Sequence, residues 1–112
     1  MRGFQVGPPE IEGVLLSHPH IVDAAVIGVK HPTEPETELP RAYVVRRPSP
    51  EAHELDEGVI RAWCGERLAS YKALTGGVKF VDVIPKNPSG KILKRLLREM
   101  AKKEADQGRS KL

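Results

Sequence analysis

The sequence predicts a small α+β domain in which a three-stranded sheet is covered by about three helices. Its length of 112 residues suits one compact domain. Short apolar runs rich in valine and isoleucine alternate along the chain with segments whose apolar residues recur at helical spacing. Such a mixture is typical of a sheet with helices packed on its faces.

A first helix is expected to begin at the proline pair of residues 8–9 and to end before Pro19. Proline is favoured at the first helical position, and Ile11 and Leu15 lie on one helical face. The residues before this helix, GFQV at 3–6, resemble the end of a strand. We therefore expect the domain to be preceded by the remnant of an N-terminal hairpin.

Three apolar runs predict the strands. They are AAVIGV at 24–29, AYVV at 42–45 and VKFVDVI at 78–84. We expect the first two to pair in an antiparallel sense. The third is interrupted only by Lys79 and Asp82, whose side chains fall on opposite faces, so we expect this strand to be mostly covered.

Two further helices follow from the apolar spacing. One runs from Leu55 to Leu68, and the other carries an apolar stripe over residues 92–100 with basic side chains pointing away from it. The simplest use of that stripe is to cover the sheet. The alternative is that residues 91–103 form a basic amphipathic helix that binds a protein, a membrane surface or nucleic acid.

Composition narrows the classes of function. With 39% hydrophobic and 29% charged residues, the chain has the composition of a globular protein. A net charge of +3 and 4% aromatic residues do not indicate a nucleic-acid partner, and no apolar run is long enough to span a bilayer. His18, His20 and the single Cys64 lack metal-ligand spacing, so we expect no metal site.

Lys91 is the candidate catalytic residue, in the segment PKNPSGK at 85–91. The match to a phosphate-binding loop fails, because the first glycine of that motif would fall at Pro85 and Ile92 replaces the required Ser or Thr. A structural reading makes Ser89 the N-cap of a helix and Lys91 a solvated charge. A cation in the first helical turn opposes the helix dipole, so this position also fits a site for an anion.

The segment PKNPSGKI at 85–92 resembles the P-K-x-P-S-G-K-I signature of the acyl-CoA synthetases, within the adenylate-forming superfamily. Three more segments resemble motifs of that family in the same order along the chain: GFQVGPPEIE at 3–12, HPHIVDAAV at 18–26 and YK at 71–72. The resemblance covers nearly the whole chain and corresponds to the AMP-binding enzyme C-terminal domain of 4-coumarate–CoA ligase-like enzymes.

This resemblance implies an acid–thiol ligase that uses ATP and coenzyme A as co-substrates, with Mg²⁺ held by a large N-terminal adenylation domain. It implies that Lys91 is the adenylation lysine and that Gln5 serves the thioester step. Gly3 and Phe4 would line the path of coenzyme A. The loop that presents the lysine contains Pro88, Ser89 and Gly90, which we interpret as its hinge.

The carboxylic acid substrate and the nucleotide would bind to the large domain, so we expect this chain alone not to turn over. We interpret the chain as an excised domain or the product of a truncated reading frame. We assign residues 1–106 to the C-terminal domain that moves against its large partner, and residues 107–112 to a flexible tail.

The tail ends in Ser110, Lys111 and Leu112, the tripeptide that peroxisomal import receptors recognise. The residues before it are polar, so we expect the tail to be exposed, as recognition by a receptor requires. These features predict a peroxisomal location.

Overall fold

The computed structural model describes residues 8–31, 33–34, 36–68 and 74–110, with side chains described as far as residue 105. Helix α1 (Pro8–Leu16) leads into strands β1 (Ile21–Lys30) and β2 (Glu38–Arg46). A short 3-10 helix, η1 (Glu51–Glu54), and helix α2 (Glu57–Arg67) follow. Strand β3 (Val78–Phe80) and helix α3 (Lys94–Ser110) complete the described fold. The predicted α+β class is confirmed, whereas the expected remnant of an N-terminal hairpin falls outside the described residues.

The sheet has the order β1-β2-β3 and is mixed. Strands β1 and β2 pair antiparallel from Ile21 opposite Arg46 to Lys30 opposite Glu38, which confirms the predicted antiparallel pair. Strand β3 pairs parallel with β2. Because successive side chains of a strand point to opposite faces, the apolar runs of β1 and β2 supply buried residues to both sides of the sheet.

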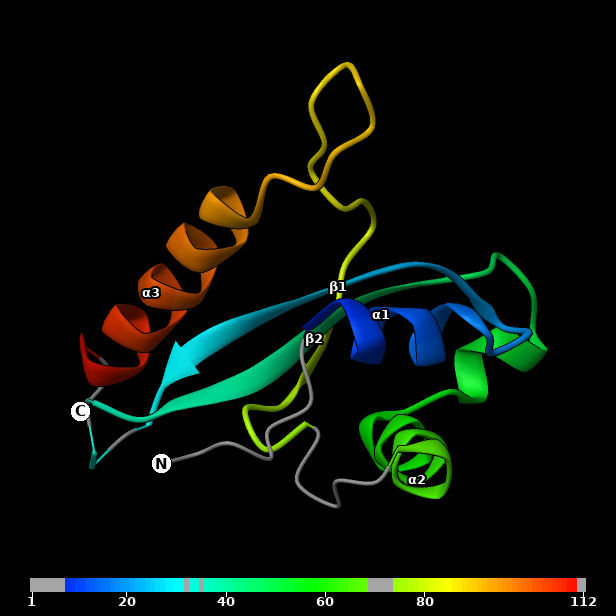
Figure 1. Ribbon diagram of the computed structural model, residues 1–112, viewed down its shortest axis with the longest axis horizontal. Coiled ribbons are helices and arrows are strands. Elements are labelled where there is room, and N and C mark those ends of the chain that lie inside the picture. The colour runs from blue at the N-terminus through cyan, green and yellow to red at the C-terminus, as the bar shows by residue number, and fades with distance from the viewer. Residues whose placement is uncertain (1–7, 32, 35, 69–73, 111–112) are drawn as a thin grey trace.

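One face of the sheet is covered by α1 and α2, which lie together on the side opposite α3 (Figure 1). This face buries Ala24 and Val26 of β1 and Val44 of β2 against a large apolar cluster. The helical spacing that predicted α1 places Ile11 and Leu15 in the same cluster, both fully buried. These two helices therefore hold the larger of the two cores.

Helix α3 covers the other face, where β1 and β2 contribute Ala25, Ile27 and Tyr43. Leu97 of α3 is fully buried in this second cluster, whereas Met100 remains 42% exposed. The apolar stripe of α3 is thus largely used within the fold, as its covering role requires.

Strand β3 is shorter than the predicted strand of residues 78–84, and this part of the prediction is wrong. Val81 still donates its N–H to the Val44 carbonyl at 3.0 Å, but the chain then leaves the edge of the sheet. Ile84 turns into the core beneath α3, and Val83 is 72% exposed. Burial of one isoleucine thus replaces continued strand pairing.

Candidate functional site

Residues 85–93 form a β-hairpin, which we call the lysine hairpin. Its base is closed where the Leu93 N–H donates to the Pro85 carbonyl at 2.9 Å. Next to this bond, Lys86 and Ile92 pair in antiparallel fashion. The lysine hairpin projects beyond α3 and the sheet at the top of Figure 1.

The tip of the hairpin is a tight turn whose sequence suits its geometry. The Gly90 N–H donates to the Asn87 carbonyl at 2.9 Å, and the Asn87 N–H donates to the Lys91 carbonyl at 2.9 Å. Pro88 occupies the position that favours a fixed φ near −65°, and Asn87 precedes it. Gly90 has a φ of +89°, a backbone conformation in which glycine carries no steric penalty.

The Asn87 side chain stabilises this turn by accepting hydrogen bonds within it. Its Oδ1 atom accepts hydrogen bonds from the Ser89 N–H at 3.1 Å, the Ser89 hydroxyl at 2.7 Å and the Lys91 N–H at 2.9 Å. An asparagine oxygen that accepts from backbone groups two residues on is a common turn device. The turn is therefore organised by one side chain as well as by its backbone.

The structure contradicts the alternative reading of Ser89 and the placement of Lys91 at the start of a helix. Ser89 is not a helix N-cap, and Lys91 does not lie in the first turn of a helix, because α3 begins at Lys94. The opposition between Lys91 and a helix dipole therefore does not arise. Within the structure, Pro88, Ser89 and Gly90 form the hydrogen-bonded turn itself, and their proposed role as a hinge stays a prediction.

One ion pair links the hairpin to the body of the domain, and a second holds Lys94, the first residue of α3, directly after it. Lys86 Nζ lies 2.6 Å from Asp23 Oδ2 of β1, and Lys94 Nζ lies 3.0 Å from Glu12 Oε2 of α1. The same Glu12 oxygen accepts the Val26 N–H at 2.7 Å. The sequence pattern did not identify these pairs, because their partners are distant in the sequence and each residue alone resembles a solvated charge.

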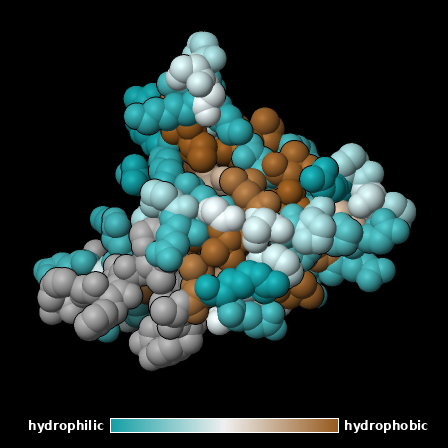
Figure 2. Space-filling model, turned by 45° about the vertical axis from the view of Figure 1, so that its right-hand side comes forward, coloured by the Kyte–Doolittle hydropathy of each residue, from teal (hydrophilic) through white to brown (hydrophobic). Residues whose placement is uncertain are grey.

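Lys91 differs from its neighbours. Its side chain is exposed, and among the described residues it takes part in no ion pair, whereas Lys86 and Lys94 both do. Figure 2 shows near-neutral to weakly hydrophilic atoms at the tip of the uppermost projection, with hydrophilic atoms and apolar surface below it. An unengaged ammonium group at such a tip can enter a neighbouring anionic site as a compact point charge.

The remaining predicted site residues lie outside the described residues. They are Gly3, Phe4 and Gln5 at the start of the chain, and Lys111 and Leu112 at its end. Ser110 is the last residue of α3, and its side chain is likewise not described. Their roles stay predictions.

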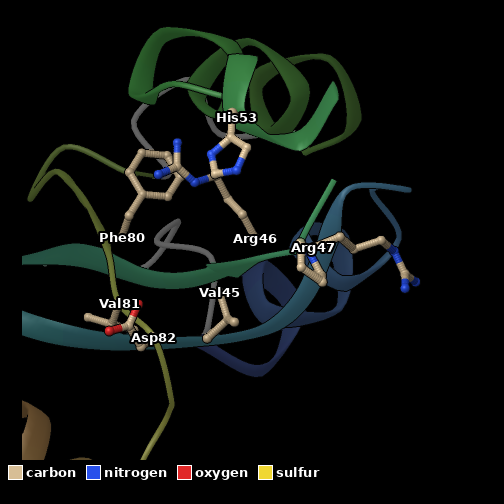
Figure 3. Close-up of a pocket in the computed structure, with 8 residues that line it drawn as sticks. Val45, Arg46, Arg47, His53, Phe80, Val81 and Asp82 are labelled. Atoms are coloured by element: carbon tan, nitrogen blue, oxygen red, sulfur yellow. The ribbon is translucent and has the colours of Figure 1, made fainter. Parts of the chain in front are cut away.

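A pocket of about 300 Å³ lies at the carboxyl ends of β2 and β3, and sequence reasoning did not identify it (Figure 3). Its basic side chains are engaged within the fold. The Arg46 guanidinium lies 4.2 Å from the centroid of the Phe80 ring and donates to the Leu55 carbonyl at 3.1 Å. Arg47 points away from Phe80 in Figure 3 and donates to the Pro19 carbonyl at 2.6 Å. We therefore assign these two arginines a structural role.

Two buried titratable groups are His18, which follows α1 and packs edge-on against Trp63 of α2, and Cys64 of α2 itself. Burial lowers the pKa of His18, with smaller contributions from the neighbouring His20 and Arg67. Burial raises the pKa of the Cys64 thiol to about 11, so this residue is protonated at neutral pH and unsuited to act as a nucleophile. Within the described part of the chain, no three His, Cys, Asp or Glu side chains gather where they could hold a metal ion.

Residues 10–91 match the family model of the AMP-binding enzyme C-terminal domain. The chain belongs to this family. The match spans the sheet, α1 from residue 10 onward, α2 and the lysine hairpin as far as Lys91. It confirms the resemblance that the sequence motifs carried.

Similar proteins include acyl-CoA ligases that are much longer than this chain. The chain is 56% identical over 99 residues to phenylacetyl-CoA ligase epaB of Aspergillus niger, covering 88% of this chain and 17% of that protein. It is 52% identical over 98 residues to 4-coumarate–CoA ligase-like 9 of Oryza sativa subsp. japonica, again covering 88% and 17%.

Among solved structures, the ATP-bound MatB from Rhodopseudomonas palustris is similar, with a TM-score of 0.72 and 36% identity, covering 88% of this chain and 18% of that one. The chain thus spans less than a fifth of the length of these relatives.

Proposed function

We propose that this chain is the C-terminal domain of an ATP-dependent carboxylic acid–CoA ligase, in which Lys91 supplies the cation for acyl-adenylate formation. The proposal rests on membership of the AMP-binding enzyme C-terminal domain family and on the names of relatives that are more than 50% identical. On this proposal the acid and ATP bind to a large N-terminal domain, with Mg²⁺ held there, and this chain alone does not turn over.

The first step joins two anions. A carboxylate oxygen attacks the α-phosphorus of ATP, the bond between the α-phosphorus and the bridging oxygen breaks, and pyrophosphate leaves. Negative charge concentrates on the phosphoryl oxygens in the transition state, so a correctly placed cation lowers the barrier. The ammonium group of Lys91 can bridge carboxylate and phosphate oxygens, because it is compact and carries three donors.

The observation that carries the assignment is the difference between Lys91 and the paired lysines around it. Lys86 and Lys94 neutralise carboxylates of the same domain, and Lys91 is exposed at the projecting turn without such a partner among the described residues. Lys102 of α3 is also exposed and has no ion pair among the described residues, so the lack of a partner supports the role of Lys91 only together with its place at the projecting turn. The freedom of Lys91 is what a residue that enters the active site of another domain requires.

In the second step the thiol of coenzyme A attacks the acyl carbonyl, the thioester forms and AMP leaves. We propose that the domain rotates between the two steps, which withdraws Lys91 and brings residues 3–5 to the cleft. Gln5 would then serve thioester formation, with Gly3 and Phe4 lining the pantetheine path. Gating of successive steps by domain movement is a general device of enzymes.

The test uses a chimera in which this chain replaces the segment it matches in phenylacetyl-CoA ligase epaB. Lys91→Ala is expected to slow pyrophosphate release from ATP and phenylacetate by about 100-fold or more, the usual loss when one charge-stabilising group is removed. Thioester formation from supplied phenylacetyl-adenylate and coenzyme A should change less than about 2-fold, since Lys91 is withdrawn for that step. Lys102→Ala, an exposed lysine of α3, is the matched control.

Equal losses in both half-reactions would contradict the role of Lys91, because the variant would then have damaged the domain as a whole. Normal pyrophosphate release by Lys91→Ala would contradict it as well. The wild-type chimera must form phenylacetyl-CoA for the comparison to be made.

We also propose that residues 110–112 direct the protein to peroxisomes through the import receptor that recognises this C-terminal tripeptide. A fluorescent protein extended by this chain should collect in peroxisomes, and removal of Leu112 should leave it dispersed. The same distribution for both fusions would contradict the proposal. None of the described helices combines the length and the apolar character needed to cross a bilayer.

A further inference from the structure

We propose that the Asp23–Lys86 ion pair and the Asn87 side chain are positioning elements that hold the lysine hairpin in one orientation for adenylation. This inference rests on the proposed role of Lys91 and adds to it the residues that aim the ammonium group. It follows from the contacts that fix the hairpin at its base and at its tip.

At the base, the backbone joins the hairpin to the rest of the domain only through the chain segments at its two ends. The Lys86–Asp23 pair, at 2.6 Å, links one of these segments to β1. The Asp23 side chain is only 23% exposed, and its other oxygen accepts the Ala24 N–H at 2.9 Å. This carboxylate is therefore itself held in place, which makes it a firmer anchor than a free surface side chain.

At the tip, the position of Lys91 depends directly on Asn87. The Lys91 N–H is bonded to Asn87 Oδ1 at 2.9 Å, and the Lys91 carbonyl accepts the Asn87 N–H at the same distance. Both backbone groups of Lys91 are thus fixed by the residue that follows Lys86. Residues 86 and 87 therefore connect Asp23 of β1, which pairs with Lys86, to the backbone of Lys91, which bonds to Asn87.

Such positioning affects the rate because charge stabilisation requires the ammonium group to arrive at the correct place. A misplacement of about 1 Å in a reacting group can cost on the order of 100-fold in rate. A hairpin with a broken anchor still carries Lys91, so we expect a smaller loss than removal of the lysine causes. The loss should be confined to the adenylation step.

The ion pair is tested in the chimera with Lys86→Met and Asp23→Asn, which remove one charge each and keep the side-chain volume. Each should lower the turnover number for pyrophosphate release by about 10-fold, an intermediate loss on this scale. The double variant should be no slower than either single variant, because both remove the same interaction. Lys79→Met breaks the Lys79–Glu104 pair of 2.7 Å on another part of the domain and should change the rate less than about 2-fold.

Asn87 is tested by comparing two substitutions. Asn87→Ala removes the acceptor oxygen and should slow pyrophosphate release by about 10-fold, whereas Asn87→Asp keeps an oxygen at the same place and should retain most of the rate. Thioester formation from supplied adenylate should be unchanged in both. A merely structural role would instead lower both half-reactions together, whether or not aspartate restores the turn.

The outcomes separate this inference from the proposed function. Normal pyrophosphate release in Lys91→Ala overturns the proposed function and this inference with it. A slow Lys91→Ala together with wild-type rates for the Lys86, Asp23 and Asn87 variants overturns this inference alone. Additive losses in the double variant, or an equal loss in Lys79→Met, also overturn it, because the effect would then not arise from the pair at the hairpin base.

Discussion

The sheet and the lysine hairpin are held by different interactions. The sheet buries apolar side chains on both faces, with a larger cluster beneath α1 and α2 and a smaller one beneath α3. In the hairpin, residues 86 and 88–91 are exposed, and its shape is set by three backbone hydrogen bonds, the Asn87 side chain and one ion pair at its base.

This difference separates the residues that stabilise the domain from the exposed residues of the hairpin, to which the proposed function assigns the chemistry. Burial of apolar surface provides most of the free energy of folding, so side chains that do not contribute to it are available for other tasks. Substitutions in the sheet and its helices should change the free energy of unfolding. Substitutions at exposed hairpin positions should change a reaction rate while leaving that free energy nearly constant.

The largest effect on the free energy of unfolding is expected from truncation of a core side chain. Ile60 of α2 is 1% exposed within the larger cluster, and Ile60→Ala should lower the free energy of unfolding by about 2–5 kcal/mol through lost burial and a new cavity. The rate of pyrophosphate release per folded chimera should be unchanged, since Ile60 lies on the face opposite α3. Denaturant titration of the chain and active-site titration of the chimera measure the two quantities.

The neighbouring Val59 provides the matched control, because it is 44% exposed on the same helix. Val59→Ala should change the free energy of unfolding by less than about 0.5 kcal/mol. Equal effects at Val59 and Ile60 would contradict the assignment of the core.

A smaller effect on the free energy of unfolding is expected from a change in pH. Burial lowers the pKa of His18 below its ordinary value of 6.5, and the neutral ring accepts the His20 N–H at Nδ1 at 3.0 Å. The unfolded chain therefore takes up the proton more readily. The stability that neutral His18 contributes is present above about pH 6.5 and is lost as the pH falls from there through the lower pKa of the folded state.

The measurement is the urea midpoint of the chain between pH 7.5 and 5.5. His18→Asn keeps an acceptor for the His20 N–H and does not titrate, so it should reduce the drop in the midpoint on acidification. His53→Asn, at an exposed position, should leave the drop unchanged. An unaltered drop in His18→Asn would show that His18 does not cause it.

Much of the fold could be predicted because the spacing of apolar residues along the sequence indicates which side chains are buried. Residues 24–29 and 42–45 were predicted as paired strands, and both are central parts of β1 and β2. The third strand was predicted too long, because an apolar run has the same pattern whether it continues in a sheet or turns into another core, as Ile84 does. The parallel pairing of β3 with β2 depends on the path of the chain between them, which local pattern does not specify.

The candidate site was only partly predictable. The motif identified Lys91, and the family model covers it. The sequence around Lys91 predicted a helix start instead of a hairpin. Pro-Ser-Gly suits both structures, and here the Asn87 side chain stabilises the hairpin. The anchoring of Lys86 by Asp23 depends on tertiary contact, so no local pattern could indicate it.

The most direct test of the account is pyrophosphate release by the Lys91→Ala chimera, measured beside thioester formation from supplied acyl-adenylate. We predict that the first rate falls about 100-fold or more and the second stays within about 2-fold of wild type. A fall of the same size in both rates, or in neither, would contradict the claim that the exposed lysine of the hairpin serves the adenylation step.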